Sequence, residues 1–149
     1  MFRGANKLTL DAKGRMVMPT RYRERLQERC EGKLVVTVDK DQCLLIYPLP
    51  DWEEIERKLM RLPTMNEEAR QLQRLMVGQA ADLEIDAHGR VLLPPNLREF
   101  AMLTRDAVLI GQGVRFELWD EVRFNERRDA WLAKKTSPDL PAEFATLSL

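Results

Sequence analysis

The chain has 149 residues, and its 24 Lys and Arg residues balance its 24 Asp and Glu residues, so the formal net charge is zero. A content of 44% hydrophobic and 32% charged residues is ordinary for one globular domain or two small ones, and it argues against disordered and fibrous proteins. No apolar run approaches the roughly 18 to 20 residues of a membrane span, and we expect no targeting segment at residues 1–4.

The two cysteines give no sign of a disulfide framework or of a metal site. Cys30 and Cys43 belong neither to a CxxC motif nor to a Cys/His spacing typical of metal ligands. We therefore expect a reduced protein of the cytoplasm, with no metal ion, no cofactor and no membrane association.

The first predicted elements are a strand, a tight turn and a returning strand. Residues 8–10 alternate in hydropathy like a half-buried strand, and residues 15–18 are predicted to return beside it. Between them, Asp11 can accept hydrogen bonds from the backbone two residues on, and Gly14 can adopt a positive φ. The sequence therefore predicts a tight β-hairpin here.

A short helix and a second hairpin follow. Pro19 ends the preceding strand and suits the start of a helix, in which Tyr22 and Leu26 form one apolar stripe. Residues 34–38 and 43–47 are apolar runs on either side of a polar turn, which predicts two paired strands. One unit thus consists of two strands, a helix and two strands.

Two helices are predicted to follow this unit. Asp51 and Glu54 resemble a capping box at the start of the first, which ends before Pro63. Asn66 is the predicted N-cap of the second, which ends at Gly78. The predicted apolar positions are Trp52, Ile55, Leu59 and Leu62 in the first helix and Ala69, Leu72 and Met76 in the second.

The second half of the chain repeats the first. Residues 83–94 match residues 8–19 without gaps, 75 positions apart, and Tyr22-Arg23-Glu24 matches Leu97-Arg98-Glu99 at the same offset. A unit with four short strands is too small to bury a core alone, so we expect the two copies to complete one another.

A further helix and a tail end the chain. Asp120 can cap a helix that holds Val122 and Trp131, and residues 137–141 are predicted to start a loose tail. Four large side chains are expected in the core rather than at a ligand site: Met16, Met18, Trp52 and Trp131.

The zero net charge hides an uneven distribution. Residues 1–29 carry eight basic and three acidic side chains, a net charge of +5, so residues 30–149 carry −5. A basic first copy can bind an anion while the remainder stays acidic. The alternative is that the arginines from Arg21 to Arg29 are only the solvated face of one helix.

The two Asp-x-x-Gly-Arg turns are the most informative feature. Arg15 directly follows the first turn, from which its guanidinium can reach phosphate or the acceptor edge of guanine, and Lys13 would act beside it. The alternative is an ion pair between Asp11 and Arg15 within the turn, which contributes only about 0 to 1 kcal/mol when exposed. Recurrence of the motif beside a basic N-terminus favours the binding interpretation.

These residues resemble the MraZ family of bacterial transcriptional regulators, which are built from two SpoVT-AbrB domains. The resemblance extends over nearly the whole chain except its C-terminal end. It rests on Met1-Phe2-Arg3-Gly4, Leu10-Asp11-Ala12-Lys13-Gly14-Arg15, Pro19-Thr20-Arg21-Tyr22-Arg23, Leu44-Leu45-Ile46-Tyr47-Pro48-Leu49-Pro50-Asp51-Trp52, and Gly111-Gln112 followed by Phe116-Glu117-Leu118-Trp119-Asp120.

The resemblance implies an α+β fold, mainly a β-barrel with flanking helices. In this swapped-hairpin, AbrB-like barrel the two copies pair as a pseudo-dimer within one chain, and chains assemble head to tail into rings. The implied parts are copy 1 at residues 5–51, a helical linker at 52–79, copy 2 at 80–123, and a C-terminal helix and tail at 124–149.

The resemblance also implies a function. Family members bind double-stranded DNA at short direct repeats upstream of the cell division and cell wall gene cluster, and they repress that cluster and their own gene. We therefore expect a cytoplasmic protein associated with the nucleoid. The family's DNA-contacting Asp-x-x-x-Arg motif maps onto Asp11 and Arg15 and, in the second copy, onto Asp86 and Arg90, with Gly14 and Gly89 in the turns.

The two copies differ in charge. Residues 82–100 hold two arginines and four acidic residues, a net charge of −2, and His88 stands where the first turn has Lys13. We therefore expect Arg90 mainly to hold structure or a neighbouring subunit. The predicted DNA-binding residues are Lys13 and Arg15 at the first turn, with Arg3, Lys7 and Arg21 nearby.

Two other functions fit the sequence less well. An enzyme is disfavoured because His88 is the only histidine and no GxSxG, Walker or HExxH motif occurs, so we expect no catalytic residue and no small-molecule substrate. The second rival is a protein-binding module of the same AbrB-like fold, similar to an antitoxin, without specific DNA readout.

Overall fold

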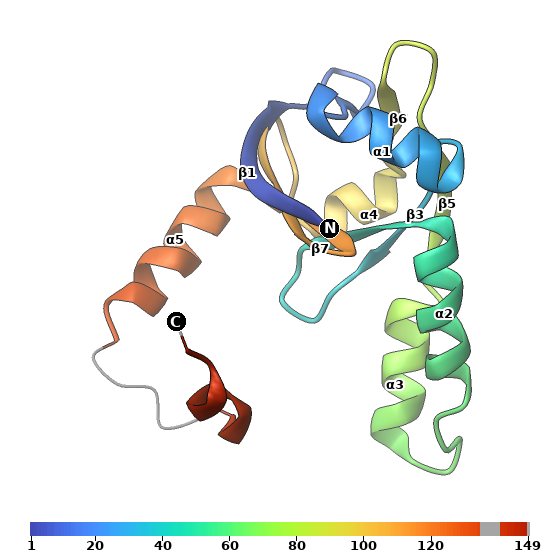
Figure 1. Cartoon of the computed structure of the whole chain (residues 1–149), viewed down its shortest axis with the longest axis vertical. Coiled ribbons are helices and arrows are strands. Elements are labelled where there is room, and N and C mark those ends of the chain that lie inside the picture. The colour runs from blue at the N-terminus through green and yellow to red at the C-terminus, as the bar shows by residue number, and fades with distance from the viewer. Residues whose placement is uncertain (135–140, 149) are drawn as a thin grey trace.

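The computed structural model describes residues 1–134 and 141–148 of the chain (Figure 1). The loose tail predicted from residue 137 falls mostly on residues 137–140, which lie outside this part. In chain order the elements are β1 (Phe2–Thr9), β2 (Arg15–Val17), α1 (Thr20–Cys30), β3 (Lys33–Val38), β4 (Leu44–Pro48), α2 (Leu49–Met60), α3 (Glu67–Met76), β5 (Ala81–Glu84), β6 (Arg90–Leu92), α4 (Pro95–Phe100), β7 (Asp106–Gly113), β8 (Arg115–Asp120), α5 (Glu121–Leu132) and a 3-10 helix (Ala142–Thr146).

The strands form one large sheet and one small ribbon. The sheet has six strands in the order β1-β7-β8-β4-β3-β5, all antiparallel, and β2 and β6 form the separate antiparallel ribbon. Strands β1 to β4 belong to the first copy and correspond in order to β5 to β8 of the second. When each strand of the sheet is replaced by its counterpart, the strand order is the same read backwards. The predicted α+β class and the double-copy, pseudo-two-fold architecture are therefore confirmed.

The same symmetry appears in the register. Met16 of β2 lies opposite Val91 of β6, and Leu45 of β4 lies opposite Glu117 of β8. In both pairs the partners are equivalent residues of the two copies. The pseudo-two-fold axis therefore passes through the centre of the ribbon and between the two middle strands of the sheet.

The prediction that residues 8–10 and 15–18 pair with each other was wrong. β1 pairs with β7 and β2 pairs with β6, so each strand finds its partner in the other copy. The turn itself forms, since the Asp11 N–H donates to the Arg15 carbonyl oxygen at 3.0 Å. The two strands separate beyond it, and their apolar side chains are buried in a core that residues of the opposite copy complete.

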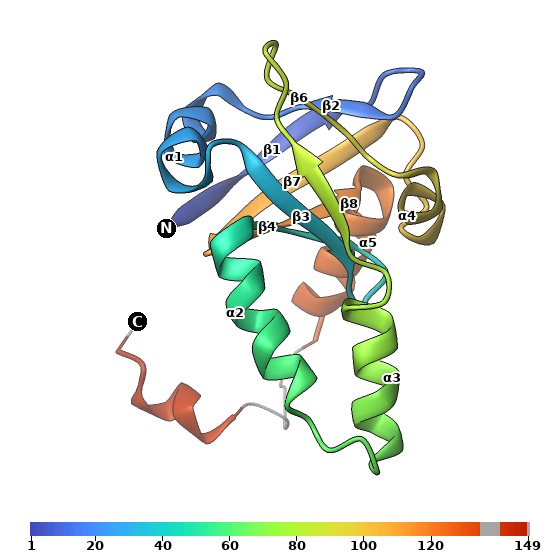
Figure 2. The ribbon, with the colours of Figure 1, turned by 90° about the vertical axis from the view of Figure 1, so that its right-hand side faces the viewer.

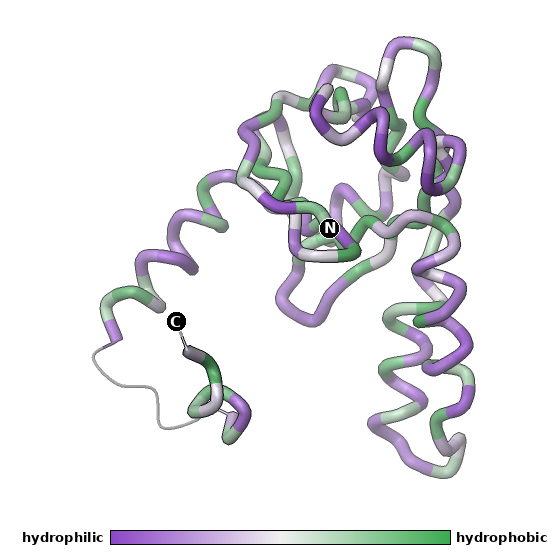
Figure 3. Tube along the Cα trace, in the orientation of Figure 1, coloured by the Kyte–Doolittle hydropathy of each residue, from purple (hydrophilic) through white to green (hydrophobic). Residues whose placement is uncertain are grey.

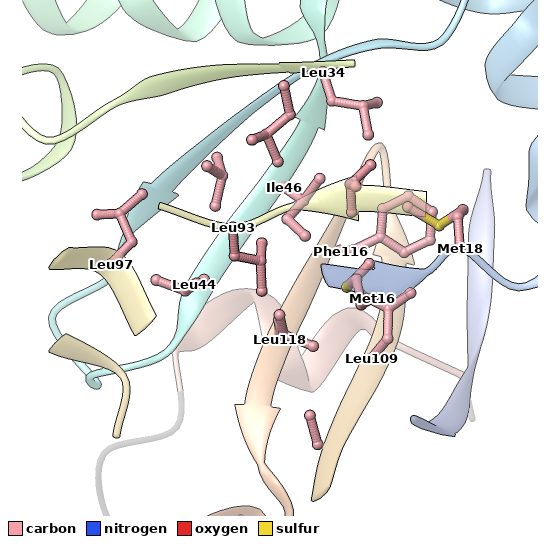
Figure 4. Packing of buried hydrophobic residues seen from close by; sticks show 14 of the residues in the cluster. Met16, Met18, Leu34, Leu44, Ile46, Leu93, Leu97, Leu109, Phe116 and Leu118 are labelled. Atoms are coloured by element: carbon pink, nitrogen blue, oxygen red, sulfur yellow. The ribbon is translucent and has the colours of Figure 1, made fainter. Parts of the chain in front are cut away.

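The main core is shared between the copies, as Figure 4 shows. Met16 and Met18 meet Leu93 and Phe116 in it, and all four side chains are fully buried. Full burial of such a side chain contributes about 1.5 to 3 kcal/mol, so neither copy retains this stabilisation without the other. The expectation that Met16 and Met18 are core residues is confirmed.

A second apolar cluster lies where α2 covers the sheet. Trp52 of α2, 3% exposed, joins Tyr47, Leu45 and Trp119 from the strands. Trp52 is therefore a core residue, as predicted. Both cysteines are buried free thiols.

Two of the three predicted side-chain caps at helix N-termini are confirmed. The Asn66 side chain accepts a hydrogen bond from the Ala69 N–H at 3.0 Å and caps α3, and Asp120 caps α5 in the same way. The predicted capping box at Asp51 was wrong, because α2 already begins at Leu49 behind Pro48. The Asp51 carboxylate instead binds Arg29, at 3.0 Å.

The expectation that Trp131 is a core residue was also wrong. It is 63% exposed, Val122 is 62% exposed, and α5 has no buried residue. Figure 1 shows α5 extending away from the sheet, and Figure 3 shows hydrophilic and hydrophobic residues alternating along it. The first half of α5 contacts the body of the protein, with Phe124 against Trp119 and Arg127 paired with Asp41 at 3.3 Å. Within residues 1–134 and 141–148, no helix is long and apolar enough to cross a membrane.

Candidate nucleic-acid interface

The two Asp-x-x-Gly-Arg turns lie at one end of the molecule. Figure 2 shows both turns, at residues 11–14 and 86–89, projecting at the end opposite the α2–α3 hairpin, with α1 and α4 on either side. The β2–β6 ribbon joins them, because each turn leads directly into one of its strands. The turns and the ribbon therefore form one continuous surface.

The first turn is held by its aspartate. Asp11 Oδ1 accepts hydrogen bonds from the backbone N–H groups of Lys13 and Arg15, at 3.0 and 2.9 Å, and Oδ2 accepts from Arg15 Nε at 2.7 Å. The hydrogen bond from the Arg15 N–H is the main cause that lowers the pKa of Asp11. The carboxylate is thus turned toward its own backbone rather than outward.

The second turn reproduces this geometry. Asp86 Oδ1 accepts from the N–H groups of His88 and Arg90, at 2.8 and 2.9 Å, and Oδ2 accepts from Arg90 Nε at 3.0 Å. The hydrogen bond from the Arg90 N–H lowers the pKa of Asp86 to about 2, with help from the His88 N–H and the Arg90 side chain. The two turns therefore present the same scaffold.

The ion pair within each turn leaves part of the guanidinium available. Only Nε of Arg15 and of Arg90 is engaged by the aspartate, and no other described residue accepts a hydrogen bond from their terminal nitrogens. The two arginine side chains are 28% and 33% exposed. The ion pair and anion binding are thus compatible, since the aspartate orients a fork that can still bind phosphate or guanine.

Each turn is also covered by an arginine from the other copy. Gly14 has a φ of +83°, and a Cβ there would collide with the guanidinium of Arg98, from α4. Gly89 has a φ of +77° and is covered in the same way by Arg23, from α1. Arg23 Nε donates to the Met18 carbonyl oxygen at 2.7 Å, which holds its guanidinium in place. Arg98 makes the equivalent bond to Leu93.

Arg23 and Arg98 were not among the residues predicted for the site. The signal was present, because they are equivalent positions of the repeat in Tyr22-Arg23-Glu24 and Leu97-Arg98-Glu99. What the sequence could not show is that each arginine reaches the turn of the opposite copy.

The structure brings together only some of the predicted binding residues. Lys13 is exposed at the first turn beside Arg15. Lys7 lies on β1 and pairs with Glu121 of α5 at 3.4 Å. Arg21 packs beside Gly4 and donates to Asn6 Oδ1 at 2.6 Å. Arg3 is exposed on β1, on the same face of that strand as Lys7.

The additional acidic residues of the second copy lie outside its turn. Asp82 and Glu84 are on β5, where Glu84 is paired in register with Lys33 of β3. At the turns themselves, the difference in charged side chains between the copies is Lys13 against His88. The electrostatic contrast between the turns is therefore smaller than the charge of residues 82–100 suggests.

Comparison with known proteins agrees with this architecture. The family model of the MraZ protein, which its description calls antitoxin-like, matches residues 1–75 and again residues 76–136. The chain is 54% identical over 150 residues to a protein of Thioalkalivibrio sulfidiphilus (strain HL-EbGR7) named Transcriptional regulator MraZ, and the match covers all of both chains.

Two further relatives bear the same name. The one from Halorhodospira halophila (strain DSM 244 / SL1) is 52% identical over 152 residues, and the one from Pseudomonas aeruginosa (strain UCBPP-PA14) is 54% identical over 151 residues, both with complete coverage of the two chains. With two matched copies and full-length relatives of this similarity, the chain belongs to the MraZ family.

Proposed function

We propose that this protein is a DNA-binding transcriptional regulator without catalytic activity. It binds short direct repeats upstream of the cell division and cell wall gene cluster, represses that cluster and its own gene, and acts in the cytoplasm at the nucleoid. The names of its relatives support the general role, and the resemblance of its motifs to the family supports the specific target.

The observation that carries the proposal is the pair of preformed arginine turns on one ribbon. Arg15 is oriented by Asp11 and Arg90 by Asp86, and a second arginine covers each turn glycine. A two-stranded ribbon fits the major groove of B-DNA, where an arginine fork can bind guanine or the adjacent phosphates. We assign the stronger contact to the first turn, because Lys13 adds a charge that His88 does not supply.

One ribbon supplies few phosphate contacts, so affinity must come from several ribbons acting together. A head-to-tail ring of chains would present successive ribbons to successive repeats and gain affinity through effective concentration. The charge of +5 on residues 1–29 and −5 on the remainder suits such a contact between the basic part of one chain and the acidic part of the next.

The first test is binding of the purified protein to its own upstream DNA over a range of salt concentrations. Binding through phosphate contacts releases counterions, so we expect log K to fall steeply and linearly with log salt. Footprinting should show protection at the repeats. Weak binding that does not depend on salt or on the repeats would end the proposal.

The second test compares Arg15→Ala with Arg90→Ala in a gel-shift titration. We expect Arg15→Ala to lose at least tenfold in affinity, since a charge-assisted hydrogen bond contributes about 1.5 to 3 kcal/mol. Arg90→Ala should lose less, and Arg61→Ala, an exposed arginine between α2 and α3, should change nothing. Equal losses at Arg15 and Arg90 would refute the asymmetry, and an unfolded Arg15→Ala would leave only the structural role of the ion pair.

A second candidate function is a protein-binding module similar to an antitoxin. The family description and the exposed apolar side chains of α5, namely Val122, Trp131 and Leu132, favour it. A pull-down that recovers a small partner in equal amount, from a protein that does not bind its upstream DNA, would replace the DNA-binding proposal with this one.

A further inference from the structure

The outer face of the β2–β6 ribbon carries a pair of exposed apolar side chains. Val17 is 47% exposed and Leu92 is 56% exposed, whereas Met16 and Val91 between them are buried in the core. Val17 and Leu92 are equivalent positions of the two copies, 75 residues apart. The same apolar exposure therefore occurs at the same place in both copies, next to the arginines of the turns.

The register places each residue of this pair beside both arginines of the turns. Arg15 lies opposite Leu92, and Val17 lies opposite Arg90. Because side chains alternate along a strand, all four point to the outer face of the ribbon. Val17 and Leu92 therefore lie on one diagonal of this face, and Arg15 and Arg90 lie on the other and begin what we call the arginine frame.

The charge around the pair selects the partner. Besides Arg15 and Arg90, the frame includes Arg98 over the first turn and Arg23 over the second. The carboxylates of the two turns are already bound by backbone N–H groups and by the arginine Nε atoms. A polyanion with apolar groups on its inner surface fits this face, and the major groove of DNA, with its thymine methyl groups between phosphates, has that chemistry.

We propose that Val17 and Leu92 contact the C5-methyl groups of thymines and so contribute to the sequence specificity of the protein. Diagonal neighbours on a ribbon are about 7 to 8 Å apart, close to two base-pair steps of about 3.4 Å. The arginines of the turns bind guanine edges or phosphates on either side, and Arg23 and Arg98 bind phosphates. This inference rests on the proposed DNA binding and adds which bases the ribbon reads.

The test removes the methyl groups from the DNA and the apolar side chains from the protein. The upstream fragment is prepared once with thymidine and once with deoxyuridine, which lacks only the methyl, and is titrated with wild-type protein and with Val17→Ser/Leu92→Ser at one salt concentration. Burial of one methyl-sized group raises affinity about fourfold. Because Val17 and Leu92 would each contact one thymine methyl, the wild type should bind the deoxyuridine fragment about fifteenfold more weakly.

The double variant should lose this preference. We expect it to bind the thymidine fragment about as weakly as the wild type binds the deoxyuridine fragment, with a ratio near one between the two DNAs. Val114→Ser/Val122→Ser is the matched control, since both valines are exposed away from the ribbon, and it should keep the wild-type ratio. Should serine unfold the ribbon, Val17→Thr keeps the β-branched shape and should still reduce the ratio.

The outcomes separate the two proposals. If the double variant keeps the wild-type ratio, or if the wild type binds both fragments equally, the thymine contact is refuted while DNA binding stands. If the wild type binds neither fragment in a salt-dependent manner, the proposed function itself fails, and the thymine contact fails with it.

Discussion

The guanidinium of Arg98 lies directly over Gly14, so a residue of the second copy completes the turn of the first. The equivalent contact joins Arg23 to Gly89. Backbone hydrogen bonds also join each turn to the opposite copy. The Leu93 N–H donates to the Gly14 carbonyl oxygen at 3.1 Å, and the Met18 N–H donates to the Gly89 carbonyl oxygen at 2.8 Å. Each turn is thus a joint product of both halves of the chain.

Gly14→Ala should therefore affect both stability and binding. The positive φ of Gly14 costs a residue with a side chain about 1 to 2 kcal/mol, and the added methyl group also displaces Arg98. Urea unfolding should show the loss of stability, and a gel shift should show weaker DNA binding. Gly113→Ala is the control, because its φ of +79° carries the same cost without an arginine above it. Unchanged DNA affinity in Gly14→Ala would contradict the role of the Arg98 contact.

His88→Lys should strengthen binding to DNA. The substitution gives the second turn the cation that Lys13 supplies in the first, and the scaffold around it is already the same. The slope of log K against log salt should become steeper by about 0.9 for the added phosphate contact. Gln71→Lys on α3, at the far end of the molecule, adds the same charge and should leave the slope unchanged. A similar effect of both lysines would mean that only total charge matters.

The carboxyl group of Asp86 should titrate at about pH 2 in the folded protein, below the ordinary aspartate value of about 3.9. Because the folded pKa is lowered, the contribution of this group to stability is complete above about pH 4 and is lost as the pH falls toward 2. The carboxyl carbon chemical shift of Asp86, followed by NMR, measures this pKa.

Arg90→Ala separates the causes of this shift. The variant keeps the backbone N–H that contributes most, so the pKa of Asp86 should rise but remain below its ordinary value. A return to the ordinary value in Arg90→Ala would show that the side-chain ion pair, rather than the backbone, holds the turn.

Residues 1–79 alone should not form a folded monomer. This fragment contains β1 and β2 but lacks their partners β7 and β6, and its half of the shared core would be exposed to water. A heteronuclear NMR spectrum should show poor dispersion or a self-associated species, and adding residues 80–149 should restore a well-dispersed one-to-one complex. A folded monomer of the fragment would contradict the exchange of strands between copies.

The local features of the site were predictable from the sequence because they depend on residues close together in the chain. Asp11 accepts hydrogen bonds from residues two and four positions on, Gly14 adopts the positive φ that its turn needs, and Asn66 caps the helix that follows it. The repeat and the unequal charge of the halves were also visible in the sequence itself.

Local patterns failed where a distant partner decided the outcome. Asp51 fits a capping box, yet α2 begins at Leu49 and places Asp51 inside the helix, where its carboxylate binds Arg29. Trp131 has the chemistry of a core residue, yet in the described part of the chain it remains 63% exposed.

The sequence by itself determined the hydrogen bonds within the turns, the caps of α3 and α5 and the basic first copy, since each follows from hydrogen bonds or charges within a short stretch of chain, and the repeat is visible in the sequence itself. Only the tertiary structure decided that β1 and β2 pair with the opposite copy, that Arg98 covers Gly14, and that Val17 and Leu92 share one exposed face. Two nearly equivalent copies offer several strand partners of similar local preference. Burial of the shared core selects among them, and that free energy depends on contacts far apart in the chain.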